Sequence, residues 1–288
     1  MVLIADSGST KTHWCVIDKT GVLKQVFTKG INPFYQTEDE ISKELELVLI
    51  PELKDVHIES IYFYGAGCSF PDKKAIVSNA LVHNFNNISI EVQSDLLGAA
   101  RSLFGDSKGI ACILGTGSNS CLYDGKEISE NVSPLGFILG DEGSGAVLGK
   151  TLIADCLKNQ LPVQLKDKFM SEYELTPAII LENVYKKPFP NRYLAKFSPF
   201  LLQNIENPSV FNIIYNSFDA FFVRNVQQYE CENMQVSFIG SVAYYFRDTL
   251  EIVASERGLN IGKIEQSPMD GLVEYHKLPL TPKGGIRD

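Results

Sequence analysis

The chain has 288 residues, of which 44% are hydrophobic and 21% charged, as in folded globular proteins. Its formal net charge is −9, and its basic residues form no cluster larger than pairs such as Lys73–Lys74, which argues against a nucleic-acid partner. No apolar run approaches the ~20 residues of a membrane-spanning helix, and the N-terminus lacks the basic region of a signal peptide. We therefore expect a cytoplasmic protein without a nucleic-acid or membrane partner, which must bind any anionic ligand through local groups.

The cysteines show neither a Cys-x-x-Cys pair nor the Cys/His spacing of a zinc site. Two of them lie inside apolar strand patterns, where a free cysteine behaves as a small hydrophobic residue. We expect reduced thiols, as in a reducing cytoplasm. The cysteines are Cys15, Cys68, Cys112, Cys121, Cys156 and Cys231.

The chain begins with an α/β pattern. Hydrophobic alternation predicts three short strands, then a helix with Thr37 as its N-cap, and then strands that alternate with helices. This order favours an α/β domain with a mixed sheet. The predicted strands are Val2–Ala5, Thr12–Asp18, Val22–Thr28, Ser60–Tyr64 and Ile88–Gln93, and the predicted helices are Glu38–Leu49, Pro71–Phe85 and Asp95–Phe104.

The same pattern restarts near residue 108. When Gly8-Ser9 is set against Gly117-Ser118, an apolar run before each loop, a strand after it and an acidic turn ending in glycine line up, which indicates a weak internal repeat. Residues 150–235 are less regular, with helical stretches. The predicted elements are the strands Lys108–Leu114, Asn119–Tyr123, Glu127–Val132 and Val236–Ile239, the helix Val242–Arg257, and a helix start in Pro268–His276.

The first loop, Asp6–Thr12, joins two strands and carries the groups that bind an anion. Gly8 allows a tight turn and a close approach of the backbone, and the amides and side chains of Ser9, Thr10 and Lys11 add donors. Asp6, at the end of the first strand, is placed where a carboxylate can hold Mg²⁺ directly or through water. An ordinary hairpin turn remains the alternative for this loop taken alone.

The second loop, Gly115–Ser118, repeats the arrangement with Gly115, Thr116, Gly117 and Ser118, and favours phosphate binding more strongly. Two other phosphate-binding motifs fail. Only three residues separate the glycines in the segment Gly145–Thr151, so it is no P-loop, and Ser120 stands where a dinucleotide motif needs its third glycine.

Together with Gly136–Ser144 and Gly240-Ser241, these loops resemble the actin/hexokinase/Hsp70 ATPase superfamily. More narrowly, they are similar to its N-acetylglucosamine kinase and BadF/BadG-type ATPase group. The segment Gln93–Asp95 resembles the strand end that carries the catalytic aspartate in those kinases. The resemblance implies an α/β fold of two RNase-H-like (actin-like ATPase) domains with an interdomain cleft. We expect one domain over residues 1–106, joined by a C-terminal helix within about 267–288, and the other over 107–266.

The resemblance also implies roles for single residues, with ATP and Mg²⁺ as the cofactors. The two loops would hold the phosphates, Asp6 the metal, and Gly240 and Ser241 the adenosine. Asn32, Asn119, Gly136 and Asp141 would contact the sugar, and Phe34 stands where the animal enzymes often have a tryptophan. Asp95 would be the general base that accepts a proton from a sugar hydroxyl during phosphoryl transfer.

Each acidic candidate has a simpler interpretation. Asp95 comes just before a helix, and aspartate is a favoured N-cap, so it could serve only to cap that helix. Asp141 and Glu142 also precede a helical run that starts near Ser144. The glycines around Asp141 and Glu142 favour instead a close approach of the backbone to a ligand.

The expected function is ATP-dependent phosphorylation of an amino sugar, most simply of N-acetylglucosamine to its 6-phosphate. Two alternatives stay open. One is a BadF-type ATPase that activates a partner enzyme through an iron–sulfur cluster, which draws attention to Cys68; the other is a sugar-sensing regulator without catalysis. The residues do not decide which amino sugar is bound or whether the chain forms a homodimer.

Overall fold

The computed structural model describes residues 1–8, 10–230 and 233–277, which form two compact units. The first unit comprises residues 1–106 and the chain from residue 268 onward; the second comprises residues 107–267. Each unit contains one five-stranded sheet flanked by helices, and the expected α/β class is confirmed. Among the described residues, no helix combines the length and apolar character needed to cross a membrane.

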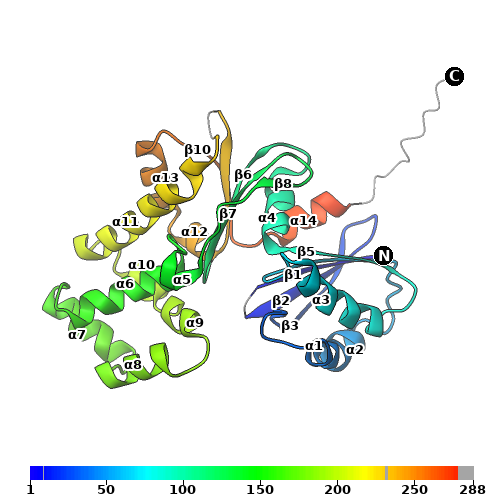
Figure 1. The fold of residues 1–288 in the computed structure, drawn as a ribbon, viewed down its shortest axis with the longest axis horizontal. Helices are drawn as coiled ribbons and strands as arrows, with labels where there is room; N and C mark the ends of the chain where they lie inside the picture. Colours follow the sequence, from blue (N-terminus) through cyan, green and yellow to red (C-terminus); the bar gives the residue numbers. More distant parts are fainter. Residues whose placement is uncertain (9, 231–232, 278–288) are drawn as a thin grey trace. The chain divides into compact units, whose positions relative to one another are not determined.

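The sheet of the first unit, drawn in blue to cyan in Figure 1, has the strand order β3-β2-β1-β4-β5. Strands β1, β2 and β3 form an antiparallel meander, whereas β1, β4 and β5 are parallel. The carboxyl ends of the parallel strands therefore share one edge of the sheet, as ligand-binding edges of α/β sheets do. The strands are β1 (Val2–Ser7), β2 (Lys11–Ile17), β3 (Val22–Lys29), β4 (Ser60–Gly65) and β5 (Ser89–Ser94).

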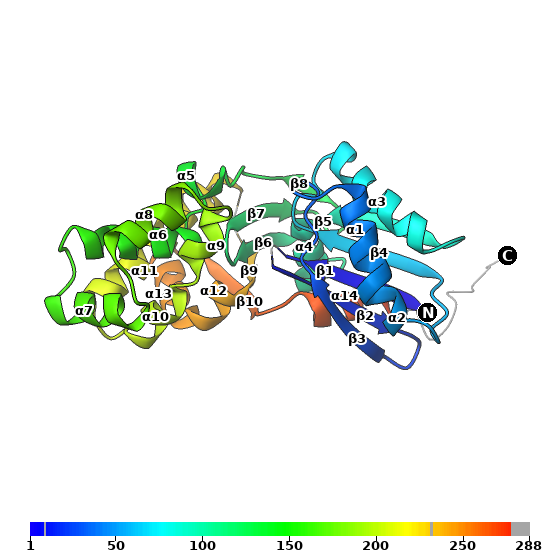
Figure 2. The ribbon, with the colours of Figure 1, turned by 90° about the horizontal axis from the view of Figure 1, so that it is seen from below.

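Strand β1 is buried on both faces, and its alternating side chains enter two different cores. Leu3 and Ala5 pack with residues of the helices α1 (Glu38–Glu44) and α3 (Pro71–Asn84), which lie side by side (Figure 2). Val2 and Ile4 pack instead with the last helix, α14 (Met269–His276). Helix α4 (Asp95–Phe104) packs against α14.

The predicted helix 38–49 begins as expected but does not stay regular. Thr37 and Glu40 form a capping box at its N-terminus. The α-helical hydrogen bonding ends at Glu44, a π-helical turn covers Leu45–Leu49, and α2 (Ile50–Glu52) completes the segment. The π turn keeps Leu45 and Leu49 buried in the same core as Ile41.

The second sheet, β10-β9-β6-β7-β8, repeats the topology of the first. Strands β6, β7 and β8 form the antiparallel meander, and β6, β9 and β10 are parallel. The internal repeat thus has a structural basis, although the prediction missed β10. The strands are β6 (Gly109–Leu114), β7 (Ser118–Tyr123), β8 (Ile128–Glu130), β9 (Gln235–Ile239) and β10 (Asn260–Glu265).

Helices of the second unit surround a core rich in phenylalanine, including Phe169, Phe197, Phe218 and Phe221. The predicted helix 242–257 is two helices, because the backbone at the buried Phe246 leaves helical geometry. The helices are α5 (Gly136–Leu139), α6 (Gly145–Leu157), α7 (Val163–Glu172), α8 (Pro177–Tyr185), α9 (Pro190–Ala195), α10 (Ser198–Gln203), α11 (Pro208–Arg224), a 3₁₀ turn (Val226–Gln228), α12 (Ser241–Tyr245) and α13 (Arg247–Glu256).

Helix α6 lies against α9 so closely that Gly149 has no room for a side chain. A Cβ atom there would overlap the carbonyl oxygen of Leu194 and lie 2.7 Å from its carbonyl carbon. Alanine normally stabilises a helix interior over glycine by ~1 kcal/mol. At this position we expect Gly149→Ala to lower the free energy of unfolding by about 2 kcal/mol, because the helices must separate. Urea denaturation measures this; Ser171→Ala on the exposed face of α7 is the control, and equal stability of Gly149→Ala would contradict the packing.

Candidate functional site

The first loop is a tight hairpin turn, and hydrogen bonds of Ser7 stabilise its base. The Gly8 N–H donates to the Lys11 carbonyl at 3.1 Å, and the Ser7 and Thr12 hydroxyls lie 2.8 Å apart. Ser7 Oγ also accepts from the Ile31 N–H at 2.9 Å. Gly8, Thr10 and Lys11 are exposed, and Ser9 lies outside the described residues. The turn is therefore anchored at its base, and its described residues Gly8, Thr10 and Lys11 are open to solvent.

Asp6 and Asp95 lie at the same edge of the first sheet. Asp6 pairs in register with Tyr64 of β4, and the next position of β4, Gly65, pairs with Ser94 of β5, which directly precedes Asp95. Burial, reinforced by the negative charge of Asp95 and opposed by Lys11, raises the pKa of Asp6 to about 7. Burial raises the pKa of Asp95 to about 6. Both carboxyl groups thus change charge near neutral pH.

Helix α4 is capped by Ser94, so the interpretation of Asp95 as its N-cap is wrong. Ser94 has the extended backbone of a cap residue, and its Oγ accepts from the Leu97 N–H at 3.2 Å. Asp95 is the first helical residue, and its Oδ1 accepts from the Leu96 N–H at 2.9 Å. Helix capping by Ser94 therefore leaves the Asp95 carboxyl group available for another role.

Asn32 lies against the turn that follows β4. Its Oδ1 accepts from the Phe34 N–H at 3.0 Å, and it would lie 2.6 Å from a Cβ atom on Gly67, whose φ of +83° also favours glycine. The Asn32 amide NH₂ has no hydrogen-bond partner among the described residues. In the same turn, the pKa of Cys68 rises to about 12 through burial and the charge of Asp95. Asn32 thus contacts the turn that follows β4, and the charge of Asp95 acts on Cys68 of the same turn.

The second loop lies on the N-terminus of α6. Its Gly115 and Thr116 carbonyls accept from the Gly145 and Ala146 N–H groups at 2.8 and 3.1 Å. Gly240 approaches the same loop, with a φ of +122° and no room for a Cβ beside the Leu114 carbonyl. The glycines of three segments therefore converge on one stretch of backbone.

A cavity of about 440 Å³ opens beside this backbone. Three of its lining residues, Gly115, Thr116 and Ser241, are site residues that the sequence predicted. Other lining residues come from α9, α10 and α12, and the sequence analysis did not predict them as site residues. No local motif marks these positions: α9 and α10 were not predicted individually, and α12 was predicted only as part of the helix 242–257. The lining residues are Gly115, Thr116, Gly145, Ala195, Lys196, Ser198, Pro199, Leu202, Ser241, Val242, Tyr245 and Phe246.

The Asp141 carboxyl group lies directly beside the second loop. Its Oδ1 accepts from the Ser118 N–H at 3.3 Å, and Oδ2 lies 3.2 Å from the position of a Cβ on Gly117. Helix α6 is capped by Ser144, so Asp141 is not its N-cap. Glu142 pairs with Arg224 at 2.8 Å, which gives it a structural role.

Asn119 and Gly136, which the sequence also predicted to contact the sugar, do not line the cavity. Asn119, on β7, accepts from the Asn131 amide at 3.0 Å. Gly136 begins the exposed helix α5 with a φ of +75°, after Leu135 with a φ of +60°, and it does not line the cavity. Neither residue is brought to the cavity beside the second loop.

Asp6 is the residue that the sequence predicts to hold a divalent cation. The described part of the chain contains no group of three or more His, Cys, Asp or Glu side chains arranged to hold a metal ion. Mg²⁺ in phosphoryl-transfer sites commonly uses one or two carboxylates and completes its shell with phosphate and water. Asp6 and Asp95 repel each other when both are ionised, and a cation at Asp6 would relieve that repulsion.

The pKa of Asp141 gives the second unit a pH-dependent stability. Burial raises this pKa from 3.8 to about 6, so the folded state holds the proton more tightly than the unfolded state. The free energy of unfolding therefore falls as the pH rises from about 4 to about 6, and stays reduced above it. Asn keeps the hydrogen bond from Ser118 and tolerates the φ of +57° at this position.

We expect Asp141→Asn to raise the free energy of unfolding by about 2 kcal/mol at pH 8 and to have little effect at pH 4. Urea denaturation at both values measures the difference. Asp167→Asn, at an exposed position on α7, controls for the loss of one negative charge. A gain in stability that is the same at both pH values would contradict the burial of an ionised Asp141.

Comparison with known proteins places the chain in one family. The model of the BadF/BadG/BcrA/BcrD ATPase family matches residues 5–271. The structure of a candidate N-acetylglucosamine kinase from Porphyromonas gingivalis shares 52% identity and superimposes with a TM-score of 0.94, covering 96% of this chain and 99% of that one. No curated protein matches the chain.

More distant structures share the fold alone. A candidate N-acetylglucosamine kinase from Chromobacterium violaceum is 15% identical, with a TM-score of 0.73 over 95% of this chain and 98% of that one. A ROK family glucokinase from Streptomyces griseus, solved with glucose and AMPPNP, is 13% identical, with a TM-score of 0.59 over 95% and 97%. The expected actin-like fold of two α/β domains is confirmed, and the chain belongs to the BadF/BadG/BcrA/BcrD ATPase family.

Proposed function

We propose that this protein transfers the γ-phosphoryl group of ATP to a hydroxyl of an amino sugar, forming N-acetylglucosamine 6-phosphate from N-acetylglucosamine. The observation that carries the proposal is Asp95, a carboxyl group at the carboxyl edge of the parallel strands of the first sheet that is not the N-cap of α4 and has a pKa of about 6. The 52% identical protein, described as a candidate N-acetylglucosamine kinase, supports the choice of acceptor.

The carboxyl group of Asp95 suits a general base acting on the acceptor sugar. At pH 7 a carboxyl group with a pKa of about 6 is mostly ionised, yet it is a stronger proton acceptor than an ordinary aspartate. It would take the proton of the sugar hydroxyl as that oxygen attacks phosphorus. The Asn32 NH₂ group, which has no hydrogen-bond partner in the described part of the chain, would donate to an acceptor oxygen of the sugar.

The chemistry of the donor side fits a nucleotide. The cavity beside Gly115 and Ser241 combines the apolar surface of Leu202, Val242 and Phe246 with few polar groups, as nucleoside sites do. The glycine-rich backbone of the 115–118 loop and the exposed tip of the 8–11 loop would bind phosphate oxygens. Asp6 would hold Mg²⁺, which when bound neutralises phosphate charge.

The alternative of a partner-activating ATPase needs cysteine thiolates to hold a cluster. Cys68, the residue that suggested it, is fully buried, and burial raises its pKa to about 12, which opposes thiolate formation. We therefore favour the kinase. Strong absorbance near 400 nm in anaerobically purified protein would favour the alternative instead.

The experiment is a coupled ADP-release assay on a panel of amino sugars and hexoses, with the wild type and Asp95→Asn. We expect N-acetylglucosamine to be among the best acceptors. Asp95→Asn keeps the side chain's size but cannot accept the proton, so kcat should fall by ~10²–10⁴-fold with a nearly unchanged KM for ATP. Asp72→Asn, an exposed aspartate in the first turn of α3, is the matched control and should keep full activity.

Two results would contradict the proposal. ATP turnover that no sugar stimulates would exclude a sugar kinase. A kcat for Asp95→Asn within about threefold of the wild type would remove Asp95 as the base, since general bases contribute far more than this.

A further inference from the structure

Helix α4, which carries Asp95 at its start, is held in place by two unusually close contacts. A Cβ on Gly98 would lie 2.8 Å from Cβ and Cγ of Tyr64, so the helix lies directly on that ring. One turn further along α4, a Cβ on Gly271 of α14 would overlap the carbonyl oxygen of Ser102. Since interiors this dense transmit displacement, α4 cannot shift without moving β4 or α14.

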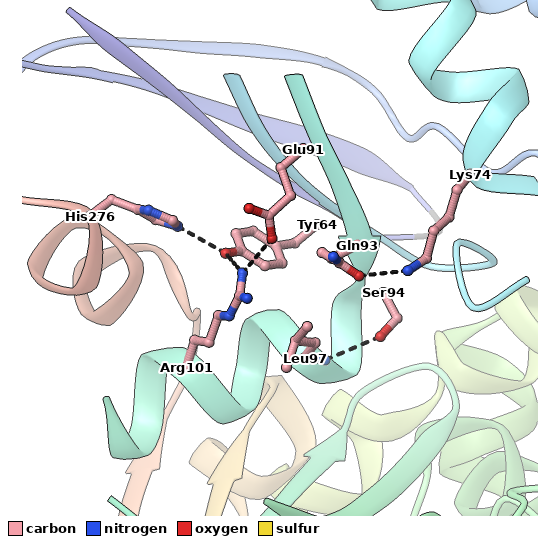
Figure 3. Close-up of polar contacts among 8 residues, drawn as sticks. All are labelled: Tyr64, Lys74, Glu91, Gln93, Ser94, Leu97, Arg101 and His276. Atoms are coloured by element: carbon pink, nitrogen blue, oxygen red, sulfur yellow. Dashed lines mark hydrogen bonds and ion pairs between the residues drawn. The ribbon is translucent and has the colours of Figure 1, made fainter. Parts of the chain in front are cut away.

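The Tyr64 hydroxyl joins three of these elements (Figure 3). Arg101, on α4, donates from Nη1 to the Tyr64 oxygen at 2.8 Å and to Glu91 Oε1 of β5 at 2.7 Å. His276, the last residue of α14, places Nε2 2.8 Å from the same hydroxyl. The His276 ring also stacks on Tyr62 at 3.9 Å between centroids.

The donor and acceptor atoms of this cluster indicate the direction of its hydrogen bonds. Arginine can only donate, so the Tyr64 oxygen accepts from Arg101. We assign the Tyr64 proton to the contact with His276 Nε2, in which Tyr64 then donates. This requires a neutral imidazole with Nε2 unprotonated. Burial, together with the positive charge of Arg101, lowers the pKa of His276 to about 4, in agreement with that state. The cluster is therefore a directed chain from Arg101 through Tyr64 to His276.

One atom of the cluster lowers the stability of the fold. Arg101 Nε is buried, and no described residue accepts a hydrogen bond from it. A buried donor without a partner costs about 1–3 kcal/mol. The guanidinium is nevertheless held in one orientation, by its hydrogen bonds to Tyr64 and Glu91.

We propose that Tyr64, Arg101 and His276 are positioning residues for Asp95, through which the last helix fixes α4. The inference rests on the proposed function, because it takes Asp95 as the base. Arg101 lies six residues after Asp95, about 9 Å along a rigid helix, so a shift at one end is carried to the other. Misplacing a catalytic group by 1 Å can cost ~10²-fold in rate.

The test removes the hydroxyl and keeps the ring. We expect Tyr64→Phe to lower kcat by about 10- to 100-fold with the KM for ATP changed less than twofold. Tyr62→Phe is the matched control: it lies on the same strand, and its hydroxyl makes no hydrogen bond to a described residue. It should retain wild-type kcat. A Tyr64→Phe enzyme with the kcat of Tyr62→Phe would overturn the proposal.

A second pair of variants separates positioning from packing. His276→Gln offers a side-chain oxygen that can accept from Tyr64, whereas His276→Leu fills similar space without an acceptor. We expect kcat of His276→Gln to stay within about threefold of the wild type, and His276→Leu to lose about as much as Tyr64→Phe. Equal kcat values for the two His276 variants would overturn the role of this hydrogen bond.

Hydrogen exchange of α4 tests the inference independently of turnover. In Tyr64→Phe and His276→Leu, the amides of residues 97–104 should exchange at least tenfold faster than in the wild type, with β1 and β4 unchanged. Unchanged protection of α4 would overturn the proposal even in an active enzyme. If the wild type phosphorylated no sugar, the proposed function would fail, and exchange alone would decide whether α14 fixes α4.

Discussion

Burial makes negative charge costly on two aspartates that share one edge of the first sheet. The parallel pairing of β1, β4 and β5 brings Asp6 and Asp95 to this edge, and each has a pKa well above that of a free aspartate. A protein without a use for such groups would gain stability by replacing them. The arrangement makes sense if a cation joins Asp6 and a proton joins Asp95 during the reaction.

The second unit uses the same topology for a different task. Where strands of the first sheet end in carboxyl groups, two strands of the second are followed by glycines: Gly115 lines a cavity, and Gly240 packs on the backbone beside it. Backbone amides and a small apolar cavity suit a nucleotide, and carboxyl and amide side chains suit a sugar hydroxyl. The repeated fold thus gives two edges of similar geometry whose chemistry differs through a few residues.

Much of this could be predicted from the sequence, because the signals are local. The glycine and hydroxyl residues of both loops, Thr37 as a cap, and most strands follow from short patterns. Ser94 and Asp95 show the limit of such patterns: both are good caps and adjacent, and only the backbone angles of the folded chain decide between them. The features that the sequence did not predict depend on long-range packing. They include the cavity wall, with residues from Ala195 to Tyr245, and the contact between Tyr64 and His276, which are 212 residues apart.

The central claim is that Asp95 accepts a proton from the acceptor sugar. It is tested most directly by the pH dependence of kcat/KM for N-acetylglucosamine, measured with saturating ATP and Mg²⁺ between pH 5 and pH 9. This parameter reports the ionisation of the enzyme before the sugar binds. With a base whose pKa is about 6, kcat/KM should be level above pH 7 and fall towards tenfold per pH unit below 6. A profile that stays level down to pH 5 would contradict the account.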